Sequence, residues 1–409
     1  MNDNRTLEAP VSWQQPLSQI PPRPWDVVII GAGPAGCTAA IGLAGAGHEV
    51  LLLDKAHFPR EKVCGDCMLT DVAGKLQRLE LLKEVHAEAA RLDGIIISSP
   101  SKIAFEIPGD FVTLKRQRLD TLLASQAVAQ GATFGIGLVT RMTVNSDLTV
   151  AVTARDSDIP LHARYAIVAT GADIGLAQQL GAITSSRPSA IAGRSYVRSS
   201  MSLNRLVLSY DRRVLPGYGW IVPLGNGEYN VGCGRFLRDG QRVNLVSAFE
   251  AFIAEFPLAK ALLREGSVIS PLRAAPLRCG LRGAHATVGE SILIAGETYG
   301  TTFALTGEGI GQAMATGEIA AAAVDGALRS GDRSRLREYP DTIQERLAAR
   351  HAGFARAQRW ISKAWLNDFI AKRARKSGYL RQALVDFIAD RCDSRKVYSL
   401  GAMLRSYVS

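Results

Sequence analysis

The sequence has 409 residues, a hydrophobic fraction of 47%, a charged fraction of 21% and a formal net charge of +10. These values are typical of a globular protein with a large core, and we expect two closely associated domains rather than several independent modules. No apolar run reaches the length of a membrane span, and residues 1–20 lack the pattern of a signal peptide. We therefore expect a cytoplasmic protein.

The excess of basic residues bears on possible partners, because a positive surface attracts anionic substrates or a lipid surface. The sequence has no compact cluster of basic and aromatic residues and no nucleic-acid-binding motif, so we predict no nucleic-acid partner. The six cysteines are scattered and do not have the spacing of a disulfide framework. Residues 1–24 are polar and proline-bearing, which predicts a flexible leader.

A strand–turn–helix–strand pattern spans residues 25–55. The β-branched run at 27–30 predicts a buried strand, and residues 31–36 (GAGPAG) form a G-x-G-x-x-G turn that opens a helix. A second apolar strand at 49–53 ends at Asp54, where a carboxylate can accept hydrogen bonds from a ribose. The complete unit predicts dinucleotide binding, and a plain strand–helix turn is the alternative.

Each glycine of this turn has a physical reason. Gly31 allows the tight turn, Gly33 lets the backbone approach a pyrophosphate, and Gly36 lets the helix pack close to the strand. The free N–H groups and the partial positive charge of the helix N-terminus then face the phosphates.

The loop at residues 58–67 is rich in turn formers and charges. Cys64 and Cys67 form a C-x-x-C pair, which is typical of a redox dithiol or of half a metal site. No second pair or histidine cluster completes a zinc site, so we predict no metal. The more ordinary interpretation is two thiols in a loop near the cofactor.

The rest of the chain alternates between helices and strands. Arg116, at the start of a predicted helix, is either a solvated charge or a ligand for a phosphate or ribityl chain. We predict helices at 70–92, 116–131, 249–263 and 306–328, and in several segments after 336. We predict strands at 95–97, 103–107 and 111–114, in several segments of 132–168, and at 194–198, 206–210, 218–223, 229–234 and 292–295.

Three further segments are candidates for a site. The strand that ends at 168 runs into a turn with Gly171, a second place where backbone can approach the dinucleotide. The segment 306–311 (TGEGIG) gives a second helix N-terminus that can face a cofactor ring or a forming anion. Tyr218 and Trp220, among glycines, belong either to the core or to the wall of a cavity.

Residues after 336 predict basic helices that contain tryptophan, with Trp365 near Lys372 and Arg373. Such helices can lie at a membrane interface. A cap packed on the main body, with a solvated basic face, is the more common structure, and we favour it.

Together these segments resemble the flavoprotein superfamily of aromatic hydroxylases, flavin-dependent halogenases and geranylgeranyl reductases. Residues 58–60 (FPR) with 62–66 (KVCGD) are similar to the F-P-R-x-K-x-C-G stretch of the geranylgeranyl reductase branch. Residues 218–223 (YGWIVP), followed by Gly232-Cys233-Gly234, resemble that branch's Y-x-W-x-F-P … G-x-G signature, and 305–310 (LTGEGI) resembles its flavin-contacting segment.

The resemblance implies an α/β fold, with a Rossmann-type FAD-binding domain at 25–185 and 270–335. It also implies an antiparallel-sheet substrate domain at 95–115 and 186–269, and a helical C-terminal cap at 336–409. The expected substrate-pocket residues are Tyr218, Trp220, Pro223 and Gly232. With the turn glycines, the expected FAD-binding residues are Gly31, Gly33, Ala35, Gly36, Asp54, Cys64, Gly65, Arg116, Val139, Gly171, Glu297, Gly307, Gly309 and Ile310.

The sequence departs from the family pattern at four places. Glu297 stands where the family has Asp, so the carboxylate expected to hold a ribityl hydroxyl is one methylene longer. The turn at 171–175 lacks the Gly and Ser of the hydroxylases, which counts against that branch. Val222 replaces a Phe of the signature and reshapes the predicted pocket, and Cys67 is an additional thiol.

The leading hypothesis is an FAD-dependent reductase that saturates a carbon–carbon double bond in an isoprenoid or similar apolar substrate. Its reductant is expected to be NADPH bound transiently, or ferredoxin or a partner flavin reductase. The second hypothesis is a flavin-dependent monooxygenase or halogenase, because halogenases carry a similar W-x-W-x-I-P segment. The third is a non-catalytic prenyl-binding protein. The residues nominate no proton donor.

Overall fold

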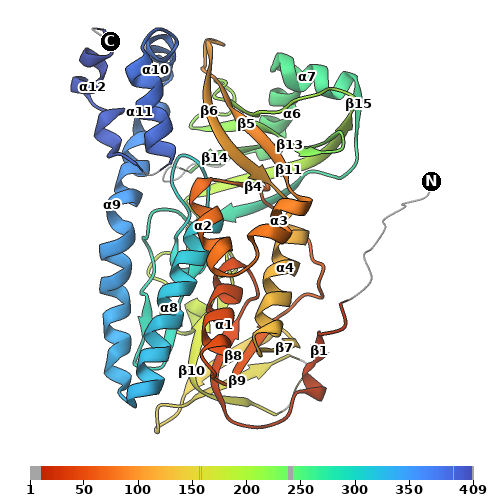
Figure 1. The fold of residues 1–409 in the computed structure, drawn as a ribbon, viewed down its shortest axis with the longest axis vertical. Coiled ribbons are helices and arrows are strands. Elements are labelled where there is room, and N and C mark those ends of the chain that lie inside the picture. Colours follow the sequence, from red (N-terminus) through yellow and green to blue (C-terminus); the bar gives the residue numbers. More distant parts are fainter. Residues whose placement is uncertain (1–10, 156, 158, 238–242, 390, 408–409) are drawn as a thin grey trace.

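The computed structural model describes residues 11–155, 157, 159–237, 243–389 and 391–407. Two β-sheets lie one above the other along the long axis of the molecule, and a column of C-terminal helices runs beside both (Figure 1). This α/β arrangement agrees with the predicted fold class.

The first sheet has a parallel centre in the order β7–β3–β2–β10–β18. Strand β3, nearly all of β2 and the second half of β10 are buried on both faces, as a parallel sheet between helices requires. Helix α1 packs against α8, where a Cβ at Gly317 would lie 2.3 Å from the Ala35 carbonyl oxygen. The elements of this domain are β2 (Trp25–Ile30), α1 (Pro34–Gly45), β3 (Val50–Asp54), α4 (Arg116–Ala129), β7 (Thr133–Ile136), β8 (Val139–Val144), β9 (Val150–Ala154), β10 (Leu161–Val168), α5 (Gly175–Gln179), β17 (Thr287–Val288), β18 (Ile292–Ile294) and α8 (Ile310–Ser330).

The second sheet is mostly antiparallel, in the order β15–β11–β14–β13–β12–β5–β6–β4, with β12 parallel to β5. Helix α6 packs on one face of this sheet, where Phe252 fills the space left by Gly219. The elements are β4 (Cys67–Met68), α2 (Thr70–Arg78), α3 (Leu82–Glu88), β5 (Ala90–Ser98), β6 (Ala104–Thr113), β11 (Ala190–Ser199), β12 (Leu206–Ser209), β13 (Gly217–Gly225), β14 (Glu228–Phe236), α6 (Leu245–Glu255), α7 (Pro257–Arg264), β15 (Gly266–Val268) and β16 (Arg273–Leu277).

The C-terminal region is helical, as predicted, and its helices α10 and α11 pack on strand β6. Their apolar side chains share one core cluster with β5, β6 and β13. Helices α10 and α11 therefore belong to the core of the second sheet, whereas the start of α9 contributes Tyr339, Ile343 and Leu347 to the core of the first. Its elements are α9 (Glu338–Ile361), α10 (Ala364–Lys376), α11 (Gly378–Ile388), the 3₁₀ turn η4 (Ser394–Lys396) and α12 (Leu400–Arg405).

Several predicted element bounds were wrong for local reasons. The predicted helix at 70–92 is two helices, α2 and α3, because Glu80 adopts a positive φ of 60° between them, and β5 already begins at Ala90. The predicted helix at 249–263 is also two, because Pro257 begins α7. Conversely, the strands predicted at 103–107 and 111–114 form the single strand β6.

Part of the predicted flexible leader is packed on the first sheet. Strand β1 (Gln15–Pro16) pairs with β7, and Leu17 and Ile20 are buried in the main core. Residues 1–10 lie outside the described residues. Strand β16 also differs from the predicted division, because it pairs with β11 in the second sheet.

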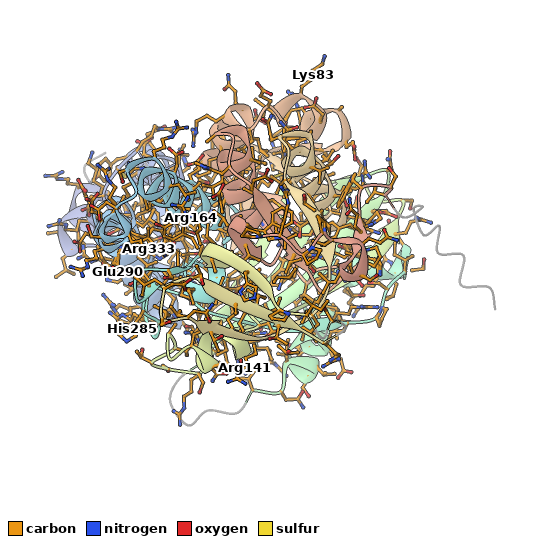
Figure 2. All side chains as sticks on the ribbon, turned by 90° about the horizontal axis from the view of Figure 1, so that it is seen from below. Lys83, Arg141, Arg164, His285, Glu290 and Arg333 are labelled. Atoms are coloured by element: carbon orange, nitrogen blue, oxygen red, sulfur yellow. The ribbon has the colours of Figure 1, made fainter. Side chains whose placement is uncertain are left out.

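At the lower end of the molecule, Arg333 in the turn after α8 contacts two segments of the first sheet domain. Its guanidinium donates to the carbonyls of Leu148 (3.1 Å) and Arg164 (3.0 Å) and lies over the ring of Tyr165. Figure 2 shows Arg333 and Arg164 at this end of the molecule. Among the described residues, no helix combines the length and the apolar character needed to span a bilayer.

Candidate functional site

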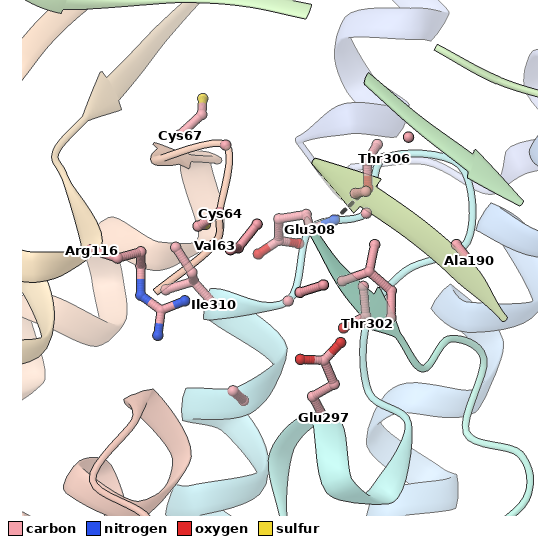
Figure 3. Close-up of a pocket in the computed structure, with 18 of the residues that line it drawn as sticks. Val63, Cys64, Cys67, Arg116, Ala190, Glu297, Thr302, Thr306, Glu308 and Ile310 are labelled. Carbon is pink, nitrogen blue, oxygen red and sulfur yellow. Dashed lines mark hydrogen bonds between the residues drawn. The ribbon is translucent and has the colours of Figure 1, made fainter. Parts of the chain in front are cut away.

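A cavity of about 450 Å³ runs between the two sheets. Its turn end lies at residues 31–34 and Asp54, and its aromatic end lies at Tyr218 and Trp220. Figure 3 shows the middle of the cavity, where side chains from the 63–67 loop, α4 and the start of α8 converge. The predicted site residues that line the cavity are Gly31, Gly33, Ala35, Asp54, Cys64, Gly65, Arg116, Gly171, Tyr218, Trp220, Glu297, Gly307, Gly309 and Ile310.

Four predicted site residues are not among the residues that line the cavity: Gly36, Val139, Pro223 and Gly232. Gly36 supports the turn, because a Cβ there would lie 1.9 Å from the Gly31 carbonyl oxygen. Gly232 lies under the indole of Trp220, whose Cζ2 would be 2.3 Å from a Cβ. The Pro223 carbonyl accepts a hydrogen bond from Thr113 (2.6 Å), and Val139 is buried in β8.

The turn end has open backbone groups beside a fixed carboxylate. Gly33 precedes α1 and has no side chain to cap it, so the N–H groups of the first helical turn have no side-chain acceptor there. Asp54 accepts hydrogen bonds from the N–H of Ala32 (Oδ2, 2.9 Å) and of Ala56 (Oδ1, 3.0 Å). These bonds hold the carboxylate at the edge of the turn, and each oxygen keeps a lone pair for a further donor.

Arg60 and Asp120 extend this charged cluster and were not nominated from the sequence. The guanidinium of Arg60 lies 3.0 Å from Asp120 and 3.6 Å from Asp54, and its Nε has no hydrogen-bond partner among the described residues. Arg116 forms a two-point ion pair with Asp120 (2.7 and 2.8 Å). Arg116 is therefore buried and fixed by a carboxylate, which excludes the solvated alternative.

The middle of the cavity holds an acid and a base, Glu297 and Lys62. Burial raises the pKa of the Glu297 carboxyl above its ordinary value, while burial lowers the pKa of the Lys62 ammonium. Each group favours the charged form of the other. Lys62 was part of a recognised motif but was not nominated, because its burial depends on contacts that are distant in sequence.

The two thiols of the C-x-x-C pair are free. Burial raises the pKa of Cys64 above its ordinary value and raises the pKa of Cys67 to about 12. Both groups are therefore held as neutral thiols, and neither environment creates a reactive thiolate. This favours the interpretation of two loop thiols beside the cavity over a redox dithiol.

The start of α8 presents a buried carboxyl. Glu308 is 9% exposed, lines the cavity and accepts a hydrogen bond at Oε1 from the N–H of Gly311 (3.0 Å). Burial and the nearby Asp71 raise the pKa of the Glu308 carboxyl to about 7. The side chain reaches from the turn before α8 toward the loop with Val63 and Cys64 (Figure 3).

The aromatic end is apolar and enclosed by two domains. Trp220 donates through Nε1 to Asn230 (2.8 Å), which fixes the indole, and the Tyr218 hydroxyl donates to the Thr306 carbonyl. The C-terminal helices close this end. The sequence predicted that they pack on the main body, but not that they line the cavity. Their lining residues are Phe354, Leu384, Phe387, Ile388 and Tyr398, and those of the sheet include Ile95, Ile97, Ile107, Leu206, Leu208 and Val222.

The sequence matches the pyridine nucleotide-disulphide oxidoreductase family over residues 25–257. The chain belongs to this family. It is 30% identical to a menaquinone reductase from Mycolicibacterium smegmatis, over 82% of this chain and 83% of the relative. It is 26% identical to digeranylgeranylglycerophospholipid reductase 2 from Methanopyrus kandleri, over 78% of this chain and 82% of the relative.

Solved structures with the same fold cover nearly all of this oxidoreductase. A geranylgeranyl bacteriochlorophyll reductase-like protein from Thermoplasma acidophilum matches with a TM-score of 0.74 and 20% identity, over 95% of this chain and 96% of the other. A flavin-dependent brominase matches with a TM-score of 0.75 and 18% identity, over 94% of this chain and 98% of the other. These likenesses establish the fold.

The residues at the turn end fit FAD, the cofactor of this oxidoreductase. Gly33 leaves open space in front of α1, because a Cβ there would meet only Arg60, at 3.9 Å. Asp54 is placed to accept ribose hydroxyls, and the unpartnered Nε of Arg60 points to a missing acceptor nearby. The continuous cavity leaves room for the flavin between Cys64, Glu297 and Gly309. The protein is thus an FAD-dependent oxidoreductase.

Proposed function

We propose that this oxidoreductase saturates carbon–carbon double bonds in the polyisoprenoid chain of a lipid. The observation that carries the proposal is the apolar aromatic end of the cavity, continuous with the predicted flavin position and closed by C-terminal helices. The aliphatic and aromatic side chains of these walls suit a hydrocarbon chain rather than a polar substrate. The names of two relatives, menaquinone reductase and digeranylgeranylglycerophospholipid reductase, denote enzymes for lipids with such chains.

The chain's own residues would position the alkene and keep water away from it. Bound FAD, once reduced, supplies a hydride to the substrate. Trp220, fixed by Asn230, and Tyr218, fixed by the Thr306 carbonyl, would hold the chain in register beside the flavin. The N-terminus of α8 would favour negative charge on the reduced ring, because its first N–H groups face the cavity at Gly309.

The test is anaerobic reoxidation of the reduced protein by a defined alkene. The FAD-loaded protein is reduced with dithionite and mixed with geranylgeraniol in detergent micelles, and flavin absorbance is followed by stopped flow. Saturation of the alkene, identified by mass spectrometry, with matching flavin reoxidation supports the proposal. Geranylgeraniol with all double bonds saturated is the control and should not reoxidise the flavin. An oxygenated or halogenated product, formed only with oxygen or halide, would replace the proposal with the monooxygenase or halogenase alternative.

The reductant in this proposal binds transiently. NADPH is one candidate, and ferredoxin or a partner flavin reductase is the other. Anaerobic mixing with each donor in turn, with flavin bleaching as the signal, distinguishes them. Fast bleaching by NADPH alone would exclude the need for a protein donor.

We also propose that the C-terminal helices contact an anionic lipid surface, from which the substrate enters. Leu400 and Leu404 of α12 are 78% and 72% exposed, and Tyr407, just after the helix, is 62% exposed, so this end of the chain presents apolar side chains outward. The guanidinium of Arg373 from α10 lies 3.7 Å from the Tyr407 ring, which places positive charge at the same surface. Exposed apolar side chains beside basic ones suit the boundary of an anionic bilayer.

Vesicle sedimentation tests this surface. The protein should bind vesicles with phosphatidylglycerol more strongly than vesicles of phosphatidylcholine alone, and Leu400→Gln with Leu404→Gln should weaken binding. The control is Val246→Gln, an equally polar change at a valine of α6 that is 53% exposed. Equal binding by all variants would contradict the assignment of this surface.

A further inference from the structure

Two carboxyl groups meet at the first turn of α8, at the edge of the cavity. The N–H of Gly311 donates to Oε1 of Glu308 (3.0 Å), and a Cβ at Gly311 would lie 2.7 Å from Oδ2 of Asp71. The two side chains come from different elements, Glu308 from the turn before α8 and Asp71 from α2. They therefore approach the same backbone position from two sides.

The hydrogen-bond donors around this pair are distributed unequally. Oδ2 of Asp71 accepts from Lys75 (3.3 Å), Gln312 (3.2 Å) and Arg350 (3.2 Å). Glu308 accepts the one backbone bond from Gly311. Two cations and an amide therefore donate directly to Asp71 and hold its negative charge, whereas among the described residues the Glu308 carboxylate accepts only from a backbone N–H.

One oxygen of each carboxyl is left over. Oδ1 of Asp71 and Oε2 of Glu308 are both buried, and neither has a hydrogen-bond partner among the described residues. Two ionised carboxylates at the same backbone position would repel each other and leave two buried acceptors without donors, which is costly. One proton on Glu308 would remove the repulsion between the two negative charges.

We infer that Asp71 and Glu308 share one proton, and that Glu308 donates it to the substrate carbon next to the one that receives the hydride. This inference rests on the proposed alkene reduction. Glu308 is the member that lines the cavity, whereas the side chain of Asp71, 13% exposed, lies on the side of Lys75 and Arg350. Glu308 thus faces the substrate, and Asp71 lies on the side from which a new proton reaches the pair.

The reaction balances with this donor. A hydride from the reduced flavin forms a C–H bond at one alkene carbon, and the π electron pair takes the Glu308 proton at the other carbon. The products are the saturated chain, oxidised FAD and the Glu308 carboxylate, which regains a proton from solvent through Asp71. The raised pKa of Glu308 agrees with a group that is protonated before the reaction.

The charged and titratable groups that face Glu308 come from three elements. Asp71 raises the pKa of Glu308, and Lys75, also on α2, lowers it. Arg350 from α9 lowers it as well, and the Cys67 thiol of β4 is close enough for Glu308 to raise the thiol's pKa. Removing Asp71 should therefore leave mainly cationic neighbours and lower the pKa of Glu308.

Infrared spectroscopy of the full-length, FAD-loaded protein tests the shared proton without any substrate. The wild-type-minus-Glu308→Gln difference spectrum should contain the C=O stretch of a protonated carboxyl, and this band should disappear as pH rises. In Asp71→Asn, the midpoint of that loss should fall by about one pH unit or more. Glu318→Gln, at the surface of the same helix, is the control and should leave the band unchanged. A difference spectrum without the band would overturn the inference.

The reoxidation assay tests the donor role. With reduced protein and geranylgeraniol, Glu308→Gln should slow flavin reoxidation by about 100-fold or more while retaining FAD. Its residual rate should also have a different solvent deuterium isotope effect from the wild type. If the wild type fails to reduce the alkene, the proposed function is wrong and the infrared result still decides the shared proton. If the wild type and Glu308→Gln reduce it equally fast, Glu308 is not the donor.

Discussion

Replacing Glu308 by glutamine should change how stability depends on pH. In the folded protein, burial and Asp71 raise the pKa of Glu308 from 4.5 to about 7. A carboxyl whose pKa is raised by folding stabilises the protein fully below about pH 4.5, where it is protonated in both states. That contribution is lost as pH rises through about 7. Glutamine cannot ionise, so the variant should keep its stability as pH rises.

The size of the effect follows from the pKa difference. Each unit corresponds to about 1.4 kcal/mol, so a rise from 4.5 to about 7 corresponds to a loss of about 3 kcal/mol between mildly acidic and mildly alkaline pH. The Glu308 carboxyl is buried, so solvent screening does not reduce this figure as it would at the surface. A change of this size is a large fraction of the stability of a typical domain.

Urea unfolding over a range of pH, with FAD in constant excess, measures the effect. As pH rises from about 4.5 to about 8, the wild type should lose about 3 kcal/mol of unfolding free energy relative to Glu308→Gln. Other raised carboxyls, such as Glu297 and Asp66, contribute equally to both proteins and cancel. Glu318→Gln, which loses a surface ion pair with Arg78, should follow the wild type. Parallel curves for the wild type and Glu308→Gln would refute the reasoning.

Three further changes probe the rest of the cavity. Gly36→Ala should be destabilised and free of FAD, because its Cβ would lie 1.9 Å from the Gly31 carbonyl oxygen. The ratio of flavin to protein absorbance measures this, and Gly45→Ala, at the end of the same helix, should retain FAD. Arg60→Ala should weaken FAD binding by about ten-fold or more in a fluorescence titration, because it removes a charged donor at the turn end. Trp220→Ala should keep FAD and its reduction by dithionite, but raise the KM for geranylgeraniol; an unchanged KM would exclude Trp220 from the substrate wall.

The parts of the site that could be predicted from the sequence are those with local signals. The turn at 31–36 lies between a strand and a helix whose patterns are unambiguous, and Gly31, Gly33 and Asp54, which the sequence predicts to bind the dinucleotide, line the cavity. The start of α8 was found for the same reason. Element breaks were missed where a single backbone conformation decides them, as at Glu80, whose positive φ leaves no clear trace in the hydrophobic pattern.

The contacts that could not be predicted join residues far apart in the sequence. Asp71 and Glu308 come together because α2 packs against the start of α8, and Arg350 reaches them from α9. No spacing rule links these three residues, and each alone reads as an ordinary surface charge. The same holds for Phe354 and Phe387, which close the aromatic end only after the C-terminal helices pack on β6.

The position of the acid pair bears on which chemistry the cavity supports. Saturating an alkene requires one hydride and one proton on neighbouring carbons, and an apolar enclosure excludes the water that would otherwise supply the proton. The aromatic end has apolar walls, so under the proposed reduction the proton would come from the protein. Glu308 is the lining carboxyl with a buried, unpartnered oxygen and a pKa raised to about 7. An apolar chain site and a buried acid on one cavity are therefore better matched to reduction than to oxygen transfer.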